Sequence, residues 1–183
     1  MVDMQFNLTP INELLLVERS RLGDPRGFFS RFFDEVAFAQ AGWPGPVAQM
    51  NHTLTEELGT IRGLHFQHAP HDEWKYVSCM VGAVFDVAVD LRTGSTSYGA
   101  WFGTTLSAEN GHSLLIPAGF AHGFQTLVPG CEMIYLHSAA YAATAEGGVN
   151  ALDPSLGIGW PLPVSARSAR DIALPRLDQQ TGS

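Results

Sequence analysis

Cysteine is scarce in this sequence, and so are basic residues. Only Cys79 and Cys131 are present, each inside an apolar stretch, which excludes a disulfide framework and predicts reduced, buried thiols in a cytoplasmic protein. Lys and Arg number 10 against 18 Asp and Glu, giving a net charge of −8. This acidic balance argues against nucleic acid or an anionic membrane as a partner. It also means that an anionic substrate must be held by a few well-placed cations.

Long apolar runs are missing as well. The apolar stretch near the start, residues 11–17, is too short to cross a bilayer or to form the core of a signal peptide. We therefore expect neither a membrane segment nor a secretory leader, in keeping with a cytoplasmic location. The length of 183 residues, with 45% hydrophobic and 15% charged residues, predicts one globular domain over residues 1–183.

Short runs of β-branched and aromatic residues, separated by glycine and proline, fill most of the sequence. Their regular spacing is typical of a sandwich or barrel and not of alternating strands and helices. One helix is predicted over residues 35–41, because Asp34 can cap its start and Gly42 can end it. The proline-rich tail beyond Asp153 is predicted to wrap over the barrel. Strands are expected over residues 14–19, 28–33, 47–53, 60–67, 74–81, 83–91, 99–106, 112–116, 122–127 and 132–138.

Two histidine-bearing segments in this all-β pattern suggest one cavity lined from two sides. The segment Gly111–His122 has the Gly, Pro, Gly, His spacing of the second cupin motif. Metal-binding cupins carry an earlier motif of His-x-His followed by Glu, and this sequence has His65, Gln67 and Lys75 at those places. An ammonium has no lone pair to give and repels a cation, and an amide oxygen is a poor ligand for a transition metal. The sequence thus predicts a metal-free cupin.

Acid–base chemistry fits the histidines better. His65 and His122 each lie in a predicted strand among apolar neighbours, where a buried imidazole needs partners, and Asp86 and Asp171 are suitable ones. A histidine held by a carboxylate is a competent general base near neutral pH. The other histidines are expected to be surface or satisfied core residues: His52, His68, His71, His112 and His137.

Removal of a proton from carbon also requires a cation for the enolate that forms, and Lys75 can supply it. An epimerisation further needs an acid on the opposite face of the substrate, for which the Tyr135 phenol is suitable. Arg26 and Arg62 can supply guanidinium groups for a diphosphate. Together these residues predict proton chemistry next to a carbonyl group.

A dozen short motifs follow one another along the chain: Asp24–Phe29, Gln49–Asn51, Arg62–Gln67, Lys75, Asp86–Arg92, Ile116–Phe124, Tyr135, Tyr141, Glu146, Asp153-Pro154, Trp160-Pro161 and Ser168-x-x-Asp171. In this order they resemble the dTDP-4-dehydrorhamnose 3,5-epimerase family. The resemblance runs from about residue 10 to residue 175. A dozen motifs in the right order are far more specific than any one of them.

The resemblance implies an all-β, double-stranded β-helix (cupin or jelly-roll) barrel that forms a homodimer by exchanging an arm. The implied substrate is a nucleoside-diphosphate 4-keto-6-deoxyhexose, inverted at C3 and C5 without a cofactor. His65 is implied as the base, oriented by Asp171. Tyr135 is implied as the acid, Lys75 as the cation at the C4 oxygen, and Tyr141 as the group that stacks on the nucleotide base. Substrate binding is implied for Arg26, Phe29, Arg31, Gln49, Asn51, Arg62, His122 and Tyr141.

One position departs from the family pattern. Arg31 stands where the family usually has a Glu that faces the thymine ring. An arginine can only donate hydrogen bonds, which would suit the acceptor edges of cytosine or guanine better. Arg31 therefore either shifts the base preference toward a CDP- or GDP-linked sugar, or points to solvent or to the diphosphate.

Three further alternatives stay open at this level. Related enzymes invert only C3 or only C5 with the same histidine and tyrosine. A 3,4-ketoisomerase uses a similar metal-free pocket, and a cupin that binds sugar nucleotides can lack activity altogether. The complete set of His65, Lys75, Tyr135 and Asp171 favours the epimerase, because a binding module has no need of it.

Overall fold

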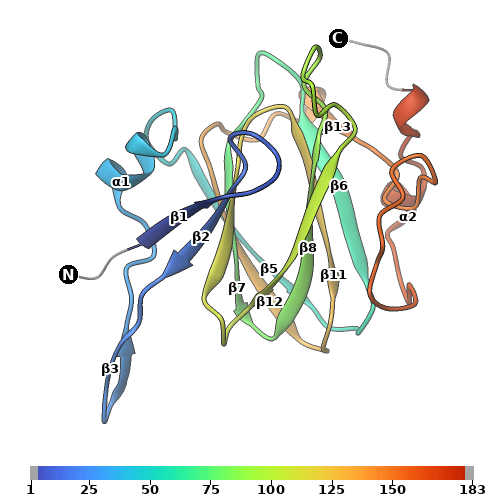
Figure 1. Cartoon of the computed structure of the whole chain (residues 1–183). Helices are drawn as coiled ribbons and strands as arrows, with labels where there is room; N and C mark the ends of the chain where they lie inside the picture. The colour runs from blue at the N-terminus through green and yellow to red at the C-terminus, as the bar shows by residue number, and fades with distance from the viewer. Residues whose placement is uncertain (1–3, 180–183) are drawn as a thin grey trace.

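A computed structural model describes residues 4–179. Its strands form two antiparallel sheets that lie face to face, as Figure 1 shows. The six-stranded sheet has the order β1 (Met4–Leu8), β2 (Leu15–Arg19), β10 (His112–Ile116), β7 (Lys75–Val81), β12 (Cys131–His137) and β5 (Gln49–Thr55). The five-stranded sheet has the order β13 (Glu146–Gly148), β6 (Ile61–Gln67), β11 (Phe120–Thr126), β8 (Ala83–Asp90) and β9 (Trp101–Ser107). The crossovers between neighbours distant in sequence confirm the predicted all-β barrel.

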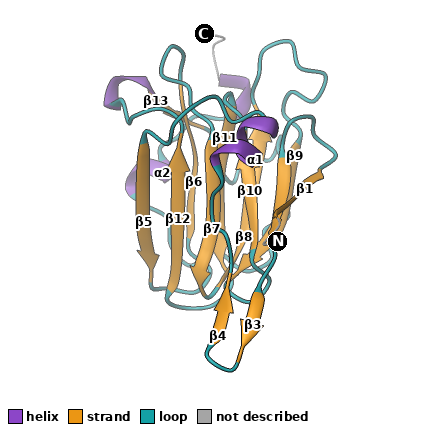
Figure 2. Cartoon of the chain, turned by 90° about the vertical axis from the view of Figure 1, so that its left-hand side faces the viewer, coloured by secondary structure: helices purple, strands orange, loops and turns teal. Residues whose placement is uncertain are grey.

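The remaining elements are short. A hairpin of β3 (Leu22–Asp24) and β4 (Gly27–Phe29) projects away from the barrel (Figure 2). The helical pieces are α1 (Glu35–Gln40), α2 (Ala169–Ile172) and two 3₁₀ turns, η1 (Ala143–Ala145) and η2 (Leu177–Gln179). Within residues 4–179, none of these helices has the length and apolar character needed to span a membrane.

Strand alternation sorts the apolar side chains into three layers. On β7, Val77 points between the sheets, whereas its neighbour Tyr76 points outward under α1. On β8, Ala88 points between the sheets and Val87 points outward beneath the C-terminal segment. Lys75 lies two residues before Val77 and so shares its inward direction. Polar residues at inward positions of this kind are therefore placed to line a cavity between the sheets.

Helix α1 covers the outer face of the six-stranded sheet. Asp34 caps it, because its side chain accepts the Ala37 N–H at 3.0 Å, and Gly42 follows with φ of +102°. Phe38 is fully buried and packs edge-on against Tyr76, with the ring centroids 4.8 Å apart. The predicted helix and both of its end signals are confirmed.

The strand expected over residues 28–33 is shorter than predicted, because β4 ends at Phe29. Phe32 and Phe33 both pack into the apolar layer under α1, where the Phe32 ring lies 5.3 Å from that of Tyr76. Consecutive side chains of a pleated strand point to opposite faces, so this pair cannot enter one layer from a regular strand. Strands β1, β3 and β13 are additional to those predicted.

The C-terminal segment covers the outer face of the five-stranded sheet, as predicted for the proline-rich tail. Trp160 packs edge-on against Phe85, with ring centroids 6.1 Å apart, and its Nε1 donates to the Ala151 carbonyl oxygen at 2.8 Å. Farther along, α2 lies against β6 (Figure 1). The tail thus brings its polar residues to the strand that carries His65.

A bulge in β6 decides which way its side chains point. Between Arg62 and His65 the pairing advances three residues on β6 but only two on β11. The extra residue allows Arg62 and His65, three positions apart, to face the same interior. Gly63 makes this possible, because its φ is +118° and a Cβ there would lie 2.7 Å from the Gly123 Cα.

A substitution at Gly123 tests the close approach of β6 and β11. A Cβ at Gly123 would lie 2.5 Å from the Arg62 carbonyl oxygen. We expect Gly123→Ala to lower the free energy of unfolding by about 1–3 kcal/mol, the usual cost of overpacking, as measured by urea denaturation. Gly45→Ala is the control, since nothing lies within 4 Å of a Cβ there. Equal stability of the two variants would contradict the tight bulge.

Candidate active site

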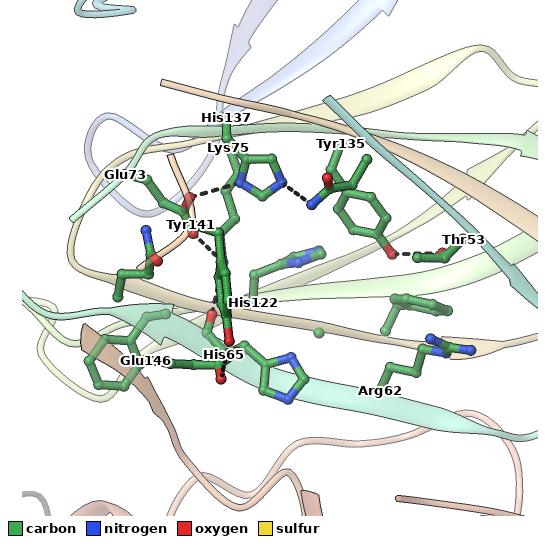
Figure 3. A pocket seen from close by; sticks show the side chains of 15 residues that line it. Thr53, Arg62, His65, Glu73, Lys75, His122, Tyr135, His137, Tyr141 and Glu146 are labelled. Carbon is green, nitrogen blue, oxygen red and sulfur yellow. Dashed lines mark hydrogen bonds and ion pairs between the residues drawn. The ribbon is translucent and has the colours of Figure 1, made fainter. Parts of the chain in front are cut away.

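A cavity of about 250 Å³ lies between the two sheets (Figure 3). One wall comes from β6 and β11, and the other from β5, β7 and β12. Most of the residues predicted for the site are among those that line it. The lining residues are Asn51, Thr53, Arg62, His65, Phe66, Gln67, Glu73, Lys75, His122, Gly123, Phe124, Tyr135, His137, Tyr141 and Glu146.

His65 is held by a carboxylate from the C-terminal segment. Asp171, in α2, is buried; its Oδ1 lies 2.7 Å from His65 Nε2, and its Oδ2 accepts the Gly63 N–H at 3.2 Å. Burial raises the pKa of Asp171, but its hydrogen bonds, first of all that with His65, outweigh burial and bring the pKa below the usual value. Because Nε2 donates to Asp171, Nδ1 is left to accept a proton. The predicted pairing of these two residues is confirmed.

A second histidine–aspartate pair lies deeper in the barrel. His122 Nε2 lies 2.9 Å and 3.0 Å from the two carboxylate oxygens of Asp86, and both side chains are buried. Burial raises the pKa of Asp86, against the opposing effects of His122 and Lys75. The His122 ring meets the Tyr135 ring edge-on at 6.1 Å. The pair therefore lies against the ring of Tyr135, and Asp86 is one of the two aspartates suggested as histidine partners.

Tyr135 faces the cavity from β12, in the sheet opposite the one that carries His65. Its Oη lies 3.3 Å from Thr53 Oγ1, and its ring stacks on His137 with centroids 6.3 Å apart. Burial raises the pKa of the Tyr135 phenol well above its ordinary value. The phenol therefore keeps its proton at neutral pH and is available as an acid.

Lys75 is buried at the start of β7. Its Nζ donates to the His65 carbonyl oxygen at 3.1 Å and lies 3.3 Å from Glu73 Oε1. Burial lowers the pKa of Lys75, and the Glu73 carboxylate opposes that effect. An ammonium at this place can stabilise an anion but cannot ligate a metal. In the part of the chain that the structure describes, no group of three or more His, Cys, Asp or Glu side chains is placed to hold a metal ion.

The mouth of the cavity carries the groups predicted to hold a nucleotide. Arg62 is exposed there and donates to a backbone carbonyl of β5 at 3.1 Å. Tyr141 is also exposed, and its phenol donates to Glu146 at 3.0 Å. Gln49 accepts the Tyr141 backbone N–H at 3.0 Å and donates to Asn51 Oδ1 at 3.0 Å. Nucleotide-binding candidates from three separate segments thus lie together at one rim.

Gln49 lies at the rim and does not line the cavity, and three other predicted substrate-binding residues lie farther from it, on or next to the hairpin. Arg26 and Phe29 belong to the β3–β4 hairpin, where Arg26 pairs with Asp24 at 2.5 Å and Phe29 is 62% exposed. Arg31 follows the hairpin and pairs with Asp34 at 3.1 Å. The hairpin projects away from the barrel (Figures 1 and 2), so one chain alone does not bring these side chains to its own site.

Among the lining residues that were not predicted for the site, two are a titratable pair, Glu73 and His137. His137, expected to be a surface or satisfied core residue, is buried with partners for both ring nitrogens, and it also lines the cavity; its Nδ1 lies 2.8 Å from Glu73 Oε2. The sequence carries a signal for His137, because it lies two positions from Tyr135 on the same strand, whereas Glu73 precedes the strand that begins at Lys75. Residues two apart on a strand share a face. His52, by contrast, pairs with an exposed Glu132 as expected of a surface histidine.

The chain is similar to known proteins over almost its whole length. Residues 8–179 match the family model described as dTDP-4-dehydrorhamnose 3,5-epimerase. A protein of that name from Sinorhizobium fredii is 42% identical over 176 residues, which cover 96% of this chain and 90% of that one. A dTDP-4-dehydrorhamnose 3-epimerase from Streptomyces niveus is 42% identical over 149 residues, 81% of this chain and 72% of that one.

A solved structure gives the same result for the fold. The epimerase from Legionella pneumophila Philadelphia 1, in complex with dTDP-4-keto-L-rhamnose, superposes with a TM-score of 0.93 at 37% identity. The match covers 98% of this chain and 95% of that one. The barrel, the added edge strands and the C-terminal wrap therefore belong to a shared architecture.

The pKa of Asp171 gives a test of its contacts. Because this pKa is lowered in the folded protein, the stabilisation from Asp171 is present above its unfolded value near 3.8 and is lost as the pH falls through the lower folded value. Asp171→Asn should be less stable than wild type at neutral pH and should lose less stability on acidification, measured by urea denaturation across this range.

The control for this test is Asp178→Asn, because Asp178 is an exposed acid of the same tail. Its unfolding profile should follow that of the wild type at every pH. An Asp171→Asn profile that also coincides with wild type would contradict the stabilising contacts of Asp171.

Proposed function

The chain belongs to the dTDP-4-dehydrorhamnose 3,5-epimerase family, and we propose that its cavity inverts C3 and C5 of dTDP-4-keto-6-deoxyglucose. One observation carries the assignment of roles. His65, held by Asp171, and the neutral phenol of Tyr135 line one cavity from opposite sheets, with the buried Lys75 amine beside them. An imidazole and a phenol so placed can reach the two faces of a sugar ring.

The reaction follows from the acidity of carbons next to a ketone. Nδ1 of His65 takes the proton from C3 or C5; the electrons of the broken C–H bond form a C=C bond, and those of the C4 carbonyl move to its oxygen. The Lys75 ammonium stabilises this oxyanion. Tyr135 then delivers a proton to the opposite face of the carbon, and the carbonyl re-forms. The two residues exchange protons with solvent to begin the next cycle.

The nucleotide is proposed to lie at the rim of the cavity. Arg62 can bind the diphosphate with its remaining N–H groups, and the exposed Tyr141 ring can stack on the base. The relatives are named for thymidine diphosphate sugars. We therefore infer a dTDP-linked substrate and not a CDP- or GDP-linked one.

The protein is further proposed to act as a homodimer. The projecting hairpin exposes Phe28 and Phe29, at 59% and 62%. β5 is an edge strand of the six-stranded sheet, and its Met50 is 67% exposed. Large exposed apolar side chains on a projecting element and on an open sheet edge are typical of an interaction surface. In the dimer, Arg26 and Phe29 of one subunit reach the cavity of the other, and Arg31 accompanies them. A cytoplasmic location accords with the two free, buried cysteines.

Exchange of solvent deuterium into the sugar tests the roles of the base and the acid. His65→Ala should lower incorporation at C3 and C5 of dTDP-4-keto-6-deoxyglucose by about 10²–10⁴-fold, the usual contribution of a general base. Tyr135→Phe should still exchange deuterium, because His65 can return the label to the same face, but should form little inverted product. NMR of the sugar reports both the label and the configuration.

His52→Ala, at an exposed histidine, is the control and should behave as wild type. Undiminished exchange by folded His65→Ala would contradict its role as the base. Wild-type exchange at C3 alone would limit the activity to 3-epimerisation, and a 3-keto product would indicate a ketoisomerase. Folded wild-type protein that binds the nucleotide sugar without any exchange would instead be a binding protein.

Mixed dimers test the exchange of the hairpin. Arg26→Ala and His65→Ala chains should each be inactive when expressed alone. When they are co-expressed in equal amounts, half of the dimers contain one chain of each kind, and each such dimer has one intact site out of two. Activity should then recover to about a quarter of wild type, as two-fold symmetry requires. A mixture no more active than its parents would show that Arg26 does not serve the partner's site.

A further inference from the structure

Lys75 is the only lysine in the sequence, and its position is an unfavourable one for a charge. Its residue is 7% exposed, and burial favours the neutral amine over the ammonium. A neutral amine would give little stabilisation to an anionic oxygen. The role proposed for Lys75 therefore requires a group that keeps it protonated inside the barrel.

Glu73 is placed to be that group. Its side chain is 8% exposed, and its two oxygens bond different partners: Oε1 lies 3.3 Å from Lys75 Nζ, and Oε2 lies 2.8 Å from His137 Nδ1 (Figure 3). Burial raises the pKa of Glu73, but the bond with His137 and the charge of Lys75 bring it below its usual value. Glu73 is therefore ionised, and it is the carboxylate in contact with Lys75.

The hydrogen bonds around His137 fix where its proton lies. Gln49 Oε1 accepts the Tyr141 N–H, so its Nε2 donates to Asn51 Oδ1. That leaves Asn51 Nδ2 facing His137 Nε2 at 3.3 Å. An amide NH₂ can only donate, so Nε2 of His137 is the acceptor and Nδ1 carries the proton toward Glu73. His137 is thus a neutral donor that holds the carboxylate and leaves its charge for Lys75.

We propose that Glu73 is a positioning residue that keeps Lys75 charged and in place at the cavity wall, with His137 holding Glu73 as a neutral donor. The catalytic role of Lys75 rests on the proposed function. The contacts of Glu73 with Lys75 and His137 do not depend on that function, because they are observed in the structure. The same hydrogen-bond chain links the Tyr141 backbone, at the nucleotide rim, to the amine beside His65.

Other charged groups also face Lys75, and they limit how far removal of Glu73 can lower the pKa of Lys75. Asp86 in β8 and Glu146 in β13 both favour the ammonium, but without a hydrogen bond to it. His65 presents its carbonyl oxygen, and His122 lies beyond Asp86. Glu73 is the first of the groups that oppose burial of the charge, so its removal should have the largest effect.

A single lysine makes the protonation of Lys75 directly measurable. Protein labelled with ¹³C-lysine gives one side-chain Cε signal, and its shift is followed against pH in wild type, Glu73→Gln and Glu132→Gln. An opposite charge raises the pKa of an amine, so loss of the carboxylate in Glu73→Gln should move the titration of Lys75 to lower pH. Glu132→Gln breaks an exposed glutamate–histidine pair at the far end of β12 and should titrate as wild type.

Coinciding titrations of wild type and Glu73→Gln would overturn the proposal. If Glu73→Gln does not fold, Glu73→Asp, which retains the charge, decides the question: a folded protein with Lys75 still charged at neutral pH supports the proposal, and a neutral Lys75 there contradicts it.

The rate of deuterium exchange separates this proposal from the proposed function. The exchange rate is measured against pH with dTDP-4-keto-6-deoxyglucose. As the pH rises, the rate should begin to fall at a lower pH in Glu73→Gln than in wild type. This fall should occur over the same pH range as the titration of Lys75. A merely structural role for Glu73 would lower the rate equally at all pH values and would leave the titration in place. A shifted titration with an unshifted rate profile would support the ion pair and contradict the catalytic role of Lys75.

Discussion

The Asp171 carboxylate joins the C-terminal segment to both the side chain and the backbone of β6. One oxygen bonds His65, and the other accepts the Gly63 N–H that the bulge leaves without a strand partner. A buried N–H without an acceptor is costly, so the contact that orients the imidazole also stabilises the backbone that aims it. The position of the C-terminal segment, the bulge in β6 and the orientation of the His65 imidazole therefore depend on one another.

The electrostatics of the cavity follow the same logic of paired groups. Asp171 bonds His65, Asp86 bonds His122, and Glu73 lies against Lys75. Each pair places a carboxyl group behind a group that faces the interior. Burial of a charge is costly unless it is paired, so these partners allow His65, His122 and Lys75 to lie beside the apolar core of the barrel. The faces presented to a substrate are thus an imidazole nitrogen, a phenol and an ammonium.

Much of the fold could be predicted from sequence, because the signals are local. The capped helix at Asp34 and the strands of the central run required only periodicity and turn residues, and they are found within a few residues of the expected positions. The region after Phe29 was mispredicted, because the apolar layer under α1 draws in Phe32 and Phe33 together. Tertiary packing overrides the local pattern there.

The site was predictable in part for a similar reason. His65, Lys75 and Tyr135 stand out by residue type, and the resemblance to a family supplied the roles. The bulge could not be foreseen, because it depends on how β6 is registered against β11. The pairing of Glu73 with His137 joins residues 64 positions apart in sequence, and only the positions of two strands and a loop in space bring them into contact.

The central claim is that a base and an acid face each other across a ketone whose oxygen is held by Lys75. A crystal structure with dTDP-6-deoxyglucose, whose C4 alcohol cannot form an enolate, tests it most directly. We expect the sugar ring between His65 Nδ1 and Tyr135 Oη, on opposite faces, with the C4 oxygen within hydrogen-bond distance of Lys75 Nζ. A ring with both side chains on one face, or a C4 oxygen turned away from Lys75, would contradict the mechanism.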